Sequence, residues 1–197
     1  MTSHISADDE LLFAWQSPSA LIARASNLRE VLGRRALLRD GACFREAYIA
    51  GKFADHINFE SVKLLRPRSQ PTPDFAVRTG EREYWFESTE ADRPSRTRNL
   101  EYQQCNFSET TRSLRDDEWV CLSDYANEID RLCRQKSLKI YDKCDGLIIN
   151  SNAFGITDEH LINDDWWKQC TRSAQEKFEQ VWRFHRSEFV RISNNIE

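Results

Sequence analysis

The sequence lacks the usual ligands of a structural zinc site. Its six cysteines form no CxxC pair and its four histidines are scattered, so we do not expect such a site. No apolar run approaches the roughly 18 residues that would indicate a membrane span. The opening stretch MTSHISADDELL has no basic region followed by an apolar run, so we expect no signal peptide. Together these absences predict a cytoplasmic protein with reduced thiols and no membrane partner.

An excess of basic charge is also absent. The formal net charge is -4, which excludes a uniformly basic coat for nucleic acid. Any nucleic-acid contact must therefore come from a local patch, and its affinity should depend strongly on salt. The chain is 40% hydrophobic, with 6 Trp and 11 Phe. This composition predicts a substantial core and argues against disorder.

The order of predicted elements indicates an α/β fold. Hydrophobic periodicity predicts helices over residues 19–39, 42–57, 122–143 and 158–178. Strands are predicted at 62–67, 73–77, 83–88 and 146–150, followed by the two final strands QVWRFH and EFVRIS. We therefore expect a central mixed β-sheet flanked by helices. We expect one domain over 1–197, with a helical N-terminal extension (1–40), a core (41–150) and a C-terminal helix with strands (151–197).

The stretch PDFAVRTGEREYWFEST, residues 73–89, predicts a β-hairpin. A turn centred between Gly80 and Glu81 gives one face four apolar residues: Phe75, Val77, Tyr84 and Phe86. The same register sets Asp74 opposite Glu87 on the other face, with Cβ atoms about 4.5–5.5 Å apart. Two carboxylates that close repel each other unless a proton or a cation lies between them. The alternatives are that Asp74 caps the turn at Pro73 and that both carboxylates are solvated strand ends.

Two further charged residues fall on apolar helix faces. Glu46 precedes Phe53 by seven residues and so lies within the inward stripe of its helix. Lys136 lies seven residues after Ile129 and four before Ile140, near the middle of an apolar face. A charge in such a position is costly without a partner. Glu46 has an alternative role as a helix N-terminal charge, and Lys136 as a side chain that reaches past the stripe into water.

These residues resemble a known family. Glu46 on a first helix, Pro73-Asp74 before a strand and Glu87-Ser88-Thr89 on the next strand resemble the PD-(D/E)xK nuclease superfamily. The α-β-β-β-α-β order from Ala42 to Asn150 matches the core of that family, so the resemblance covers roughly half of the chain. It implies a restriction-endonuclease-like fold and a metal-dependent endonuclease that hydrolyses phosphodiester bonds, with DNA favoured over RNA.

The sequence departs from the family motif at Thr89, where the family has a lysine. In that family the lysine position migrates, and a basic group is then supplied by the following helix. Lys136 is the replacement that this implies, and Lys139, on the edge of the same predicted helix face, is the second choice. If neither reaches the site, a catalytically inactive relative is the better interpretation.

The resemblance also implies a ligand set. Mg²⁺, or Mn²⁺, would be held by Asp74, Glu87 and the main-chain carbonyl of Ser88, because a hard cation prefers oxygen ligands. Glu46 would hold a metal-bound water or bind a second ion. Lys136 would orient the attacking water or stabilise the charged transition state.

Three arginines follow the hairpin in RPSRTR, residues 93–98. Arg93, Arg96 and Arg98 are predicted to contact backbone phosphates, together with Lys139. A solvated loop is the alternative. We expect a nuclease of defence or mobile-element biology. One alternative is an inactive nuclease-like fold that acts as a binding, inhibitor or immunity protein. Another is a structural protein that forms a homodimer through its Trp-rich C-terminal half.

Overall fold

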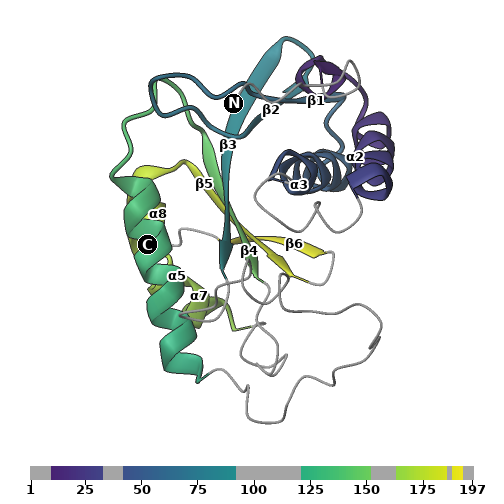
Figure 1. Cartoon of the computed structure of the whole chain (residues 1–197). Coiled ribbons are helices and arrows are strands. Elements are labelled where there is room, and N and C mark those ends of the chain that lie inside the picture. Colours follow the sequence, from purple (N-terminus) through teal and green to yellow (C-terminus); the bar gives the residue numbers. More distant parts are fainter. Residues whose placement is uncertain (1–9, 33–41, 92–120, 152–162, 186–187, 193–197) are drawn as a thin grey trace, which may run out of the picture. The chain divides into compact units, whose positions relative to one another are not determined.

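The computed structural model describes residues 10–32, 42–91, 121–151, 163–185 and 188–192. Its strands form a six-stranded mixed sheet in the order β1-β2-β3-β4-β5-β6, flanked by helices (Figure 1). This confirms the predicted α/β class with a mixed sheet. The elements are η1 (Leu11–Phe13), α2 (Pro18–Leu32), α3 (Ala42–His56), β1 (Ser61–Leu64), β2 (Phe75–Thr79), β3 (Arg82–Ala91), α5 (Leu122–Ser137), β4 (Gly146–Ser151), α7 (Asp164–Cys170), α8 (Arg172–Lys177), β5 (Gln180–His185) and β6 (Glu188–Ile192).

The chain divides into two compact units, and each is described by itself. The first unit comprises Met1–Glu87 and Tyr141–Asp145, and the second comprises Ser88–Ile140 and Gly146–Glu197. Strand β3 belongs to both, because the boundary falls between Glu87 and Ser88. The expected division into an N-terminal extension, a core and a C-terminal part stays a prediction.

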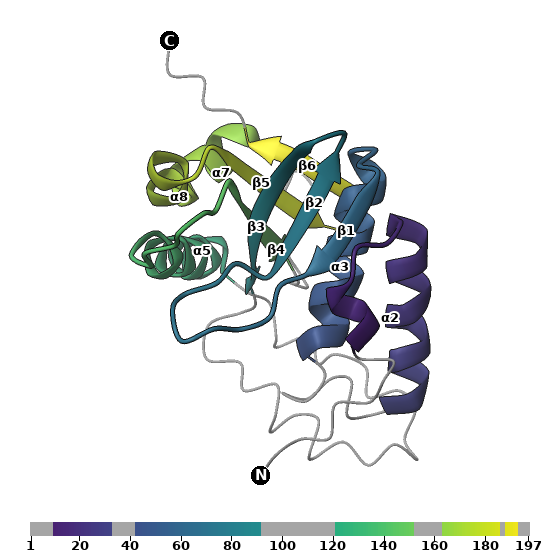
Figure 2. The ribbon, with the colours of Figure 1, turned by 90° about the horizontal axis from the view of Figure 1, so that it is seen from above.

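The first unit is built on the antiparallel strands β1, β2 and the first part of β3. Helices α2 and α3 lie next to each other along β1 and β2 (Figure 2). Phe53 of α3 is fully buried, and its ring lies 6.1 Å from that of Phe75 and 4.8 Å from that of Phe86. Phe75 and Phe86 stack at 5.6 Å. The apolar face of the hairpin therefore packs on α3, and the residues that alternate with it face the other way.

Helices α2 and α3 approach each other closely at Gly51. A Cβ at this position would meet Cγ1 of Ile22 at 2.7 Å and main-chain atoms of α2 at 3.3 Å. Contacts below 3 Å do not occur between real Cβ atoms, so a side chain here would push α2 away from α3. The glycine thus allows the two helices to pack against each other.

The second unit contains α5, α7, α8 and the strands β4–β6. Strand β4 is parallel to β5, and β5 is antiparallel to β6. The inward face of α5 carries Tyr125, Ile129 and Cys133, all fully buried. The Tyr125 hydroxyl contacts Ser151 Oγ of β4 at 2.7 Å. Trp167 of α7 is also fully buried.

Two predicted helices are shorter than expected. The helix predicted over 122–143 ends at Ser137, whose hydroxyl donates to the carbonyl oxygens of Cys133 and Ser173. Ile140 therefore does not extend the apolar face of α5, and its side chain is 83% exposed. The described part of the helix predicted over 158–178 is split into α7 and α8 at Thr171. The Thr171 hydroxyl donates to the Trp167 carbonyl at 2.7 Å, which satisfies that acceptor where the helix is interrupted.

Candidate active site

The two predicted metal ligands belong to the β2–β3 hairpin: Asp74 directly precedes β2, and Glu87 lies in β3. Phe75 pairs with Phe86 and Thr79 with Arg82, as predicted. Gly80 has φ of 56° and precedes Glu81 in a two-residue turn, which fits a glycine at the first position of a type II′ hairpin. The paired register ends at Phe75 and Phe86. The Asp74 amide also donates to the Phe86 carbonyl, at 3.0 Å, so the regular pairing stops here and the facing of Asp74 and Glu87 stays a prediction.

The two carboxylates differ in burial. Glu87 is 1% exposed, whereas Asp74, directly before β2, is half-buried. An ionised carboxylate removed from water in this way is costly unless other groups compensate its charge. The surroundings of Glu87 therefore decide what the pair can do.

Tyr141 is an electrostatic neighbour of these carboxylates. Burial raises the pKa of Tyr141 well above its usual value, and the negative charges of Glu87 and Asp74 raise this pKa further. The tyrosine thus stays protonated and able to donate at neutral pH. The pKa of Tyr141 is raised by both carboxylates, so Asp74, Glu87 and Tyr141 are close enough within the first unit to interact electrostatically.

Tyr141 was missed by sequence reasoning because it was assigned to the long helix. It instead belongs to a short segment, residues 141–145, that lies beside the first part of β3. The Asp145 amide donates to the Trp85 carbonyl at 2.8 Å, and the Trp85 amide donates to Asp145 Oδ2 at 2.6 Å. These bonds hold the segment next to the strand that carries Glu87.

Two further residues predicted for the site, Lys136 and Ser88, belong to the second unit. Lys136 of α5 follows Ile129 by seven residues and Cys133 by three, on the buried side of the helix, and it is itself half-buried. Its ammonium donates to the main-chain carbonyl of Ser88 at 3.1 Å. The predicted basic group thus binds the same carbonyl that is predicted to ligate a metal, and Ser88 directly follows Glu87 in the chain.

Glu46 lies on a different element from Asp74 and Glu87. Glu46 is half-buried on α3, the helix whose Phe53 packs on Phe75 and Phe86, whereas Asp74 and Glu87 alternate with those phenylalanines. Within the described ranges, no three His, Cys, Asp or Glu side chains form a group that could hold a metal. The three predicted carboxylates are thus not gathered into one such group, and the role of Glu46 stays a prediction.

The predicted phosphate-binding residues have two outcomes. Arg93, Arg96 and Arg98 lie outside the described residues. Lys139 is described, but its placement on the edge of a helix is wrong. It follows the end of α5, where its amide donates to the Lys136 carbonyl at 3.2 Å. The cause is the early end of α5, which removes residues 138–143 from the helix.

The donor set fits a hard cation. Asp74, Glu87 and the Ser88 carbonyl offer only oxygen, and Mg²⁺ is commonly held by one or two carboxylates with several waters. The Ser88 carbonyl also accepts a hydrogen bond from the Lys136 ammonium. The residues are therefore suited to Mg²⁺ or Mn²⁺ on chemical grounds.

Replacing Tyr141 by Phe should destabilise the protein at neutral pH by about 1–3 kcal/mol, because the buried Glu87 carboxylate loses a polar neighbour. The folded-state pKa of Tyr141 is raised above its ordinary value of 10.0. Wild-type stability from this residue is therefore present below pH 10 and falls above it, where the unfolded chain loses the phenolic proton first. Urea unfolding from pH 7 to 11 should show a steeper loss above pH 10 in wild type than in Tyr141→Phe. Equal slopes would contradict the burial of this hydroxyl.

Comparison with known proteins adds no assignment. No helix in the described part of the chain is long and apolar enough to cross a membrane. No protein-family model, curated protein or solved structure matches the chain, so a function must be inferred from the residues and their geometry.

Proposed function

We propose that the protein is a metal-dependent nuclease of the PD-(D/E)xK type, with a restriction-endonuclease-like fold, that hydrolyses phosphodiester bonds in nucleic acid. The observation that carries this proposal is the burial of Glu87 directly after Phe86, which pairs with Phe75, the residue that follows Asp74. Burial of a carboxylate beside a second carboxylate is readily explained by a cation that binds both. DNA is favoured over RNA as the substrate, in defence or mobile-element biology.

The order of elements supports the same proposal. Helix α3, strands β1–β3, helix α5 and strand β4 follow one another as α-β-β-β-α-β, which is the order that the family resemblance implies. Lys136 on α5 supports it further, because a lysine from this helix is the expected substitute for the residue missing at Thr89. Its bond to the Ser88 carbonyl places the ammonium next to the residue that follows Glu87.

The residues have distinct roles in the proposed reaction. Asp74, Glu87 and the Ser88 carbonyl would hold Mg²⁺ or Mn²⁺, which when bound lowers the pKa of a water and polarises the phosphate. The Lys136 ammonium, which donates to the Ser88 carbonyl, would donate to the attacking water or the phosphate. Glu46 would hold a water from α3. Tyr141 would orient the Glu87 carboxylate.

The proposal is tested by nuclease assays on supercoiled plasmid and on labelled single-stranded DNA and RNA. Cleavage is expected with Mg²⁺ or Mn²⁺, and it should stop when EDTA removes the metal. Titration of the protein with Mn²⁺, followed by electron paramagnetic resonance, gives a readout that does not depend on turnover. Cleavage that continues in EDTA would overturn the metal-dependent mechanism.

One observation favours an inactive nuclease-like fold as the second candidate. The protonated Tyr141 hydroxyl is an electrostatic neighbour of Glu87, and a polar neighbour can compensate a buried carboxylate without a metal. This candidate predicts no Mn²⁺ binding and no cleavage of any substrate. The protein would then act as a binding, inhibitor or immunity protein.

A further inference from the structure

A pocket in the first unit is lined in part by Pro73, the residue before Asp74. It is a pocket of about 80 Å³ between the loop that joins β1 to β2, strand β3 and the segment 141–145. Its lining consists of Arg68, Ser69, Gln70, Pro71, Thr72, Pro73, Trp85, Asp142 and Lys143. The volume is several times that of a water molecule and too small to enclose a drug-sized ligand. The pocket therefore suits a phosphate group or one face of a planar ring.

Trp85 is the largest side chain of the pocket and is held firmly. Both its main-chain amide and its carbonyl bond to Asp145. Its indole nitrogen donates to Glu83 Oε1 at 2.5 Å. The side chain is half-buried, so part of the indole stays accessible while its orientation is fixed. A fixed, partly exposed indole is the kind of platform on which a nucleobase stacks.

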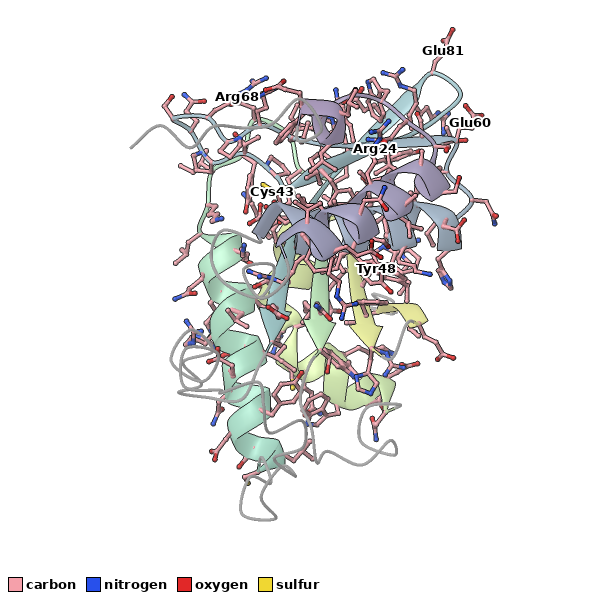
Figure 3. The ribbon with its side chains drawn as sticks, turned by 45° about the vertical axis from the view of Figure 1, so that its right-hand side comes forward. Arg24, Cys43, Tyr48, Glu60, Arg68 and Glu81 are labelled. Atoms are coloured by element: carbon pink, nitrogen blue, oxygen red, sulfur yellow. The ribbon has the colours of Figure 1, made fainter. Side chains whose placement is uncertain are left out.

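Two cations border the same pocket. Arg68 is exposed on the loop between β1 and β2, at the end of the strands opposite the turn that carries Glu81 (Figure 3). The Lys143 ammonium lies 5.8 Å from the centre of the Trp85 ring and donates to the Glu83 carbonyl at 2.5 Å. Asp142 is the one acidic residue of the lining, and Lys143 also lies 3.9 Å from Asp145 Oδ2. Arg68 and Lys143 are the cations of the lining that a phosphodiester would meet.

The pocket is close along the strand to the proposed metal ligand. Trp85 precedes Glu87 by two residues of β3, so both side chains lie on the same face of the strand. Two residues of a strand span about 6.6 Å, which is a distance that one nucleotide of an extended chain covers. A base on Trp85 would thus belong to the nucleotide next to the one at Glu87.

We propose that this pocket binds one nucleotide of a single-stranded segment of the substrate, with the base on Trp85 and the phosphate between Arg68 and Lys143. The identity of the ligand as nucleic acid rests on the proposed function. The pocket selects an unpaired nucleotide because the face of a paired base is covered by its neighbours in a duplex. Stacking is insensitive to sequence, so no base preference is expected at this position.

The test is equilibrium binding of a fluorescein-labelled octathymidylate, followed by anisotropy in EDTA so that no strand is cut. Trp85→Ala should weaken binding about 10-fold or more, whereas Trp85→Phe, which keeps an aromatic face, should stay within about 3-fold of wild type. Arg68→Ala with Lys143→Ala should reduce the slope of log K against log salt by about 1.4, because two phosphate contacts are lost.

The control is a double variant with the same loss of charge, Arg29→Ala with Lys177→Ala, at exposed positions on α2 and α8. It should leave the salt slope unchanged. If Trp85→Ala cleaves at the wild-type rate and binds the strand as tightly as wild type, the proposed nucleotide pocket is wrong but the proposed nuclease function is not affected. Strand binding that requires Trp85, without cleavage of any substrate, would support the pocket and count against the nuclease. Thymidine monophosphate that binds as tightly as the octamer would overturn a strand-binding role.

Discussion

Replacing Glu87 by Gln, or Asp74 by Asn, should lower the rate of Mg²⁺-dependent cleavage by about 10³-fold or more. Each change removes one negative charge and keeps the size of the side chain. A metal site contributes several kcal/mol to the stabilisation of a phosphoryl transition state, and about 4 kcal/mol corresponds to 10³ in rate. Single-turnover cleavage of plasmid under saturating metal gives the measurement.

The matched control for these two variants is Glu81→Gln, because Glu81 is an exposed carboxylate at the turn of the same hairpin. It should cleave at the wild-type rate. Weaker Mn²⁺ binding in Glu87→Gln and Asp74→Asn, with unchanged thermal unfolding, would attribute the loss to metal coordination. Wild-type cleavage by Glu87→Gln would show that this carboxylate is not part of the active site.

Replacing Lys136 by Met should lower the cleavage rate by about 10²–10³-fold, which is typical for removal of one preorganised donor to a charged transition state. The methionine keeps the length and the apolar stem of the lysine, so packing of α5 should change little. Metal affinity should not fall, because a positive charge near the cation is removed. Cleavage rate and Mn²⁺ affinity are therefore measured on the same samples.

Introducing Thr89→Lys into the Lys136→Met protein provides the sharper half of this test. Thr89 follows Glu87 by two residues of β3 and shares its face, which is where the family resemblance puts the lysine. We expect the double variant to recover at least 10-fold of the lost rate. Lys139→Met should be close to wild type. A large loss in Lys139→Met with none in Lys136→Met would transfer the role to the second-choice lysine.

The hairpin was predictable because its signals are local. Alternation of apolar residues and Gly80 in the turn define the register from Thr79–Arg82 to Phe75–Phe86. The facing of Asp74 and Glu87 beyond it stays a prediction. The face of α5 that carries Lys136 was predictable for the same reason. Its end was not, because residues 138–143 contain no Gly or Pro, and Ile140 continues the apolar spacing.

The contacts made by residues 141–145 had no signal in the sequence. Trp85 and Asp145 are 60 residues apart, and neither residue type predicts such pairing. Tyr141 and the pocket at Trp85 follow from that pairing, so both were missed. The only hint is Asp145, a polar residue just after the end of the helix predicted over 122–143.

The position of Tyr141–Asp145 in the first unit has a consequence for how the chain can be cut. The polypeptide passes from one unit to the other three times, after Glu87, Ile140 and Asp145. No contiguous fragment contains one whole unit and nothing else. A fragment that ended at Glu87 would lose Asp145, the partner of Trp85, and Tyr141, the electrostatic neighbour of Glu87. The first unit is thus completed only after residues up to Asp145 have been synthesised.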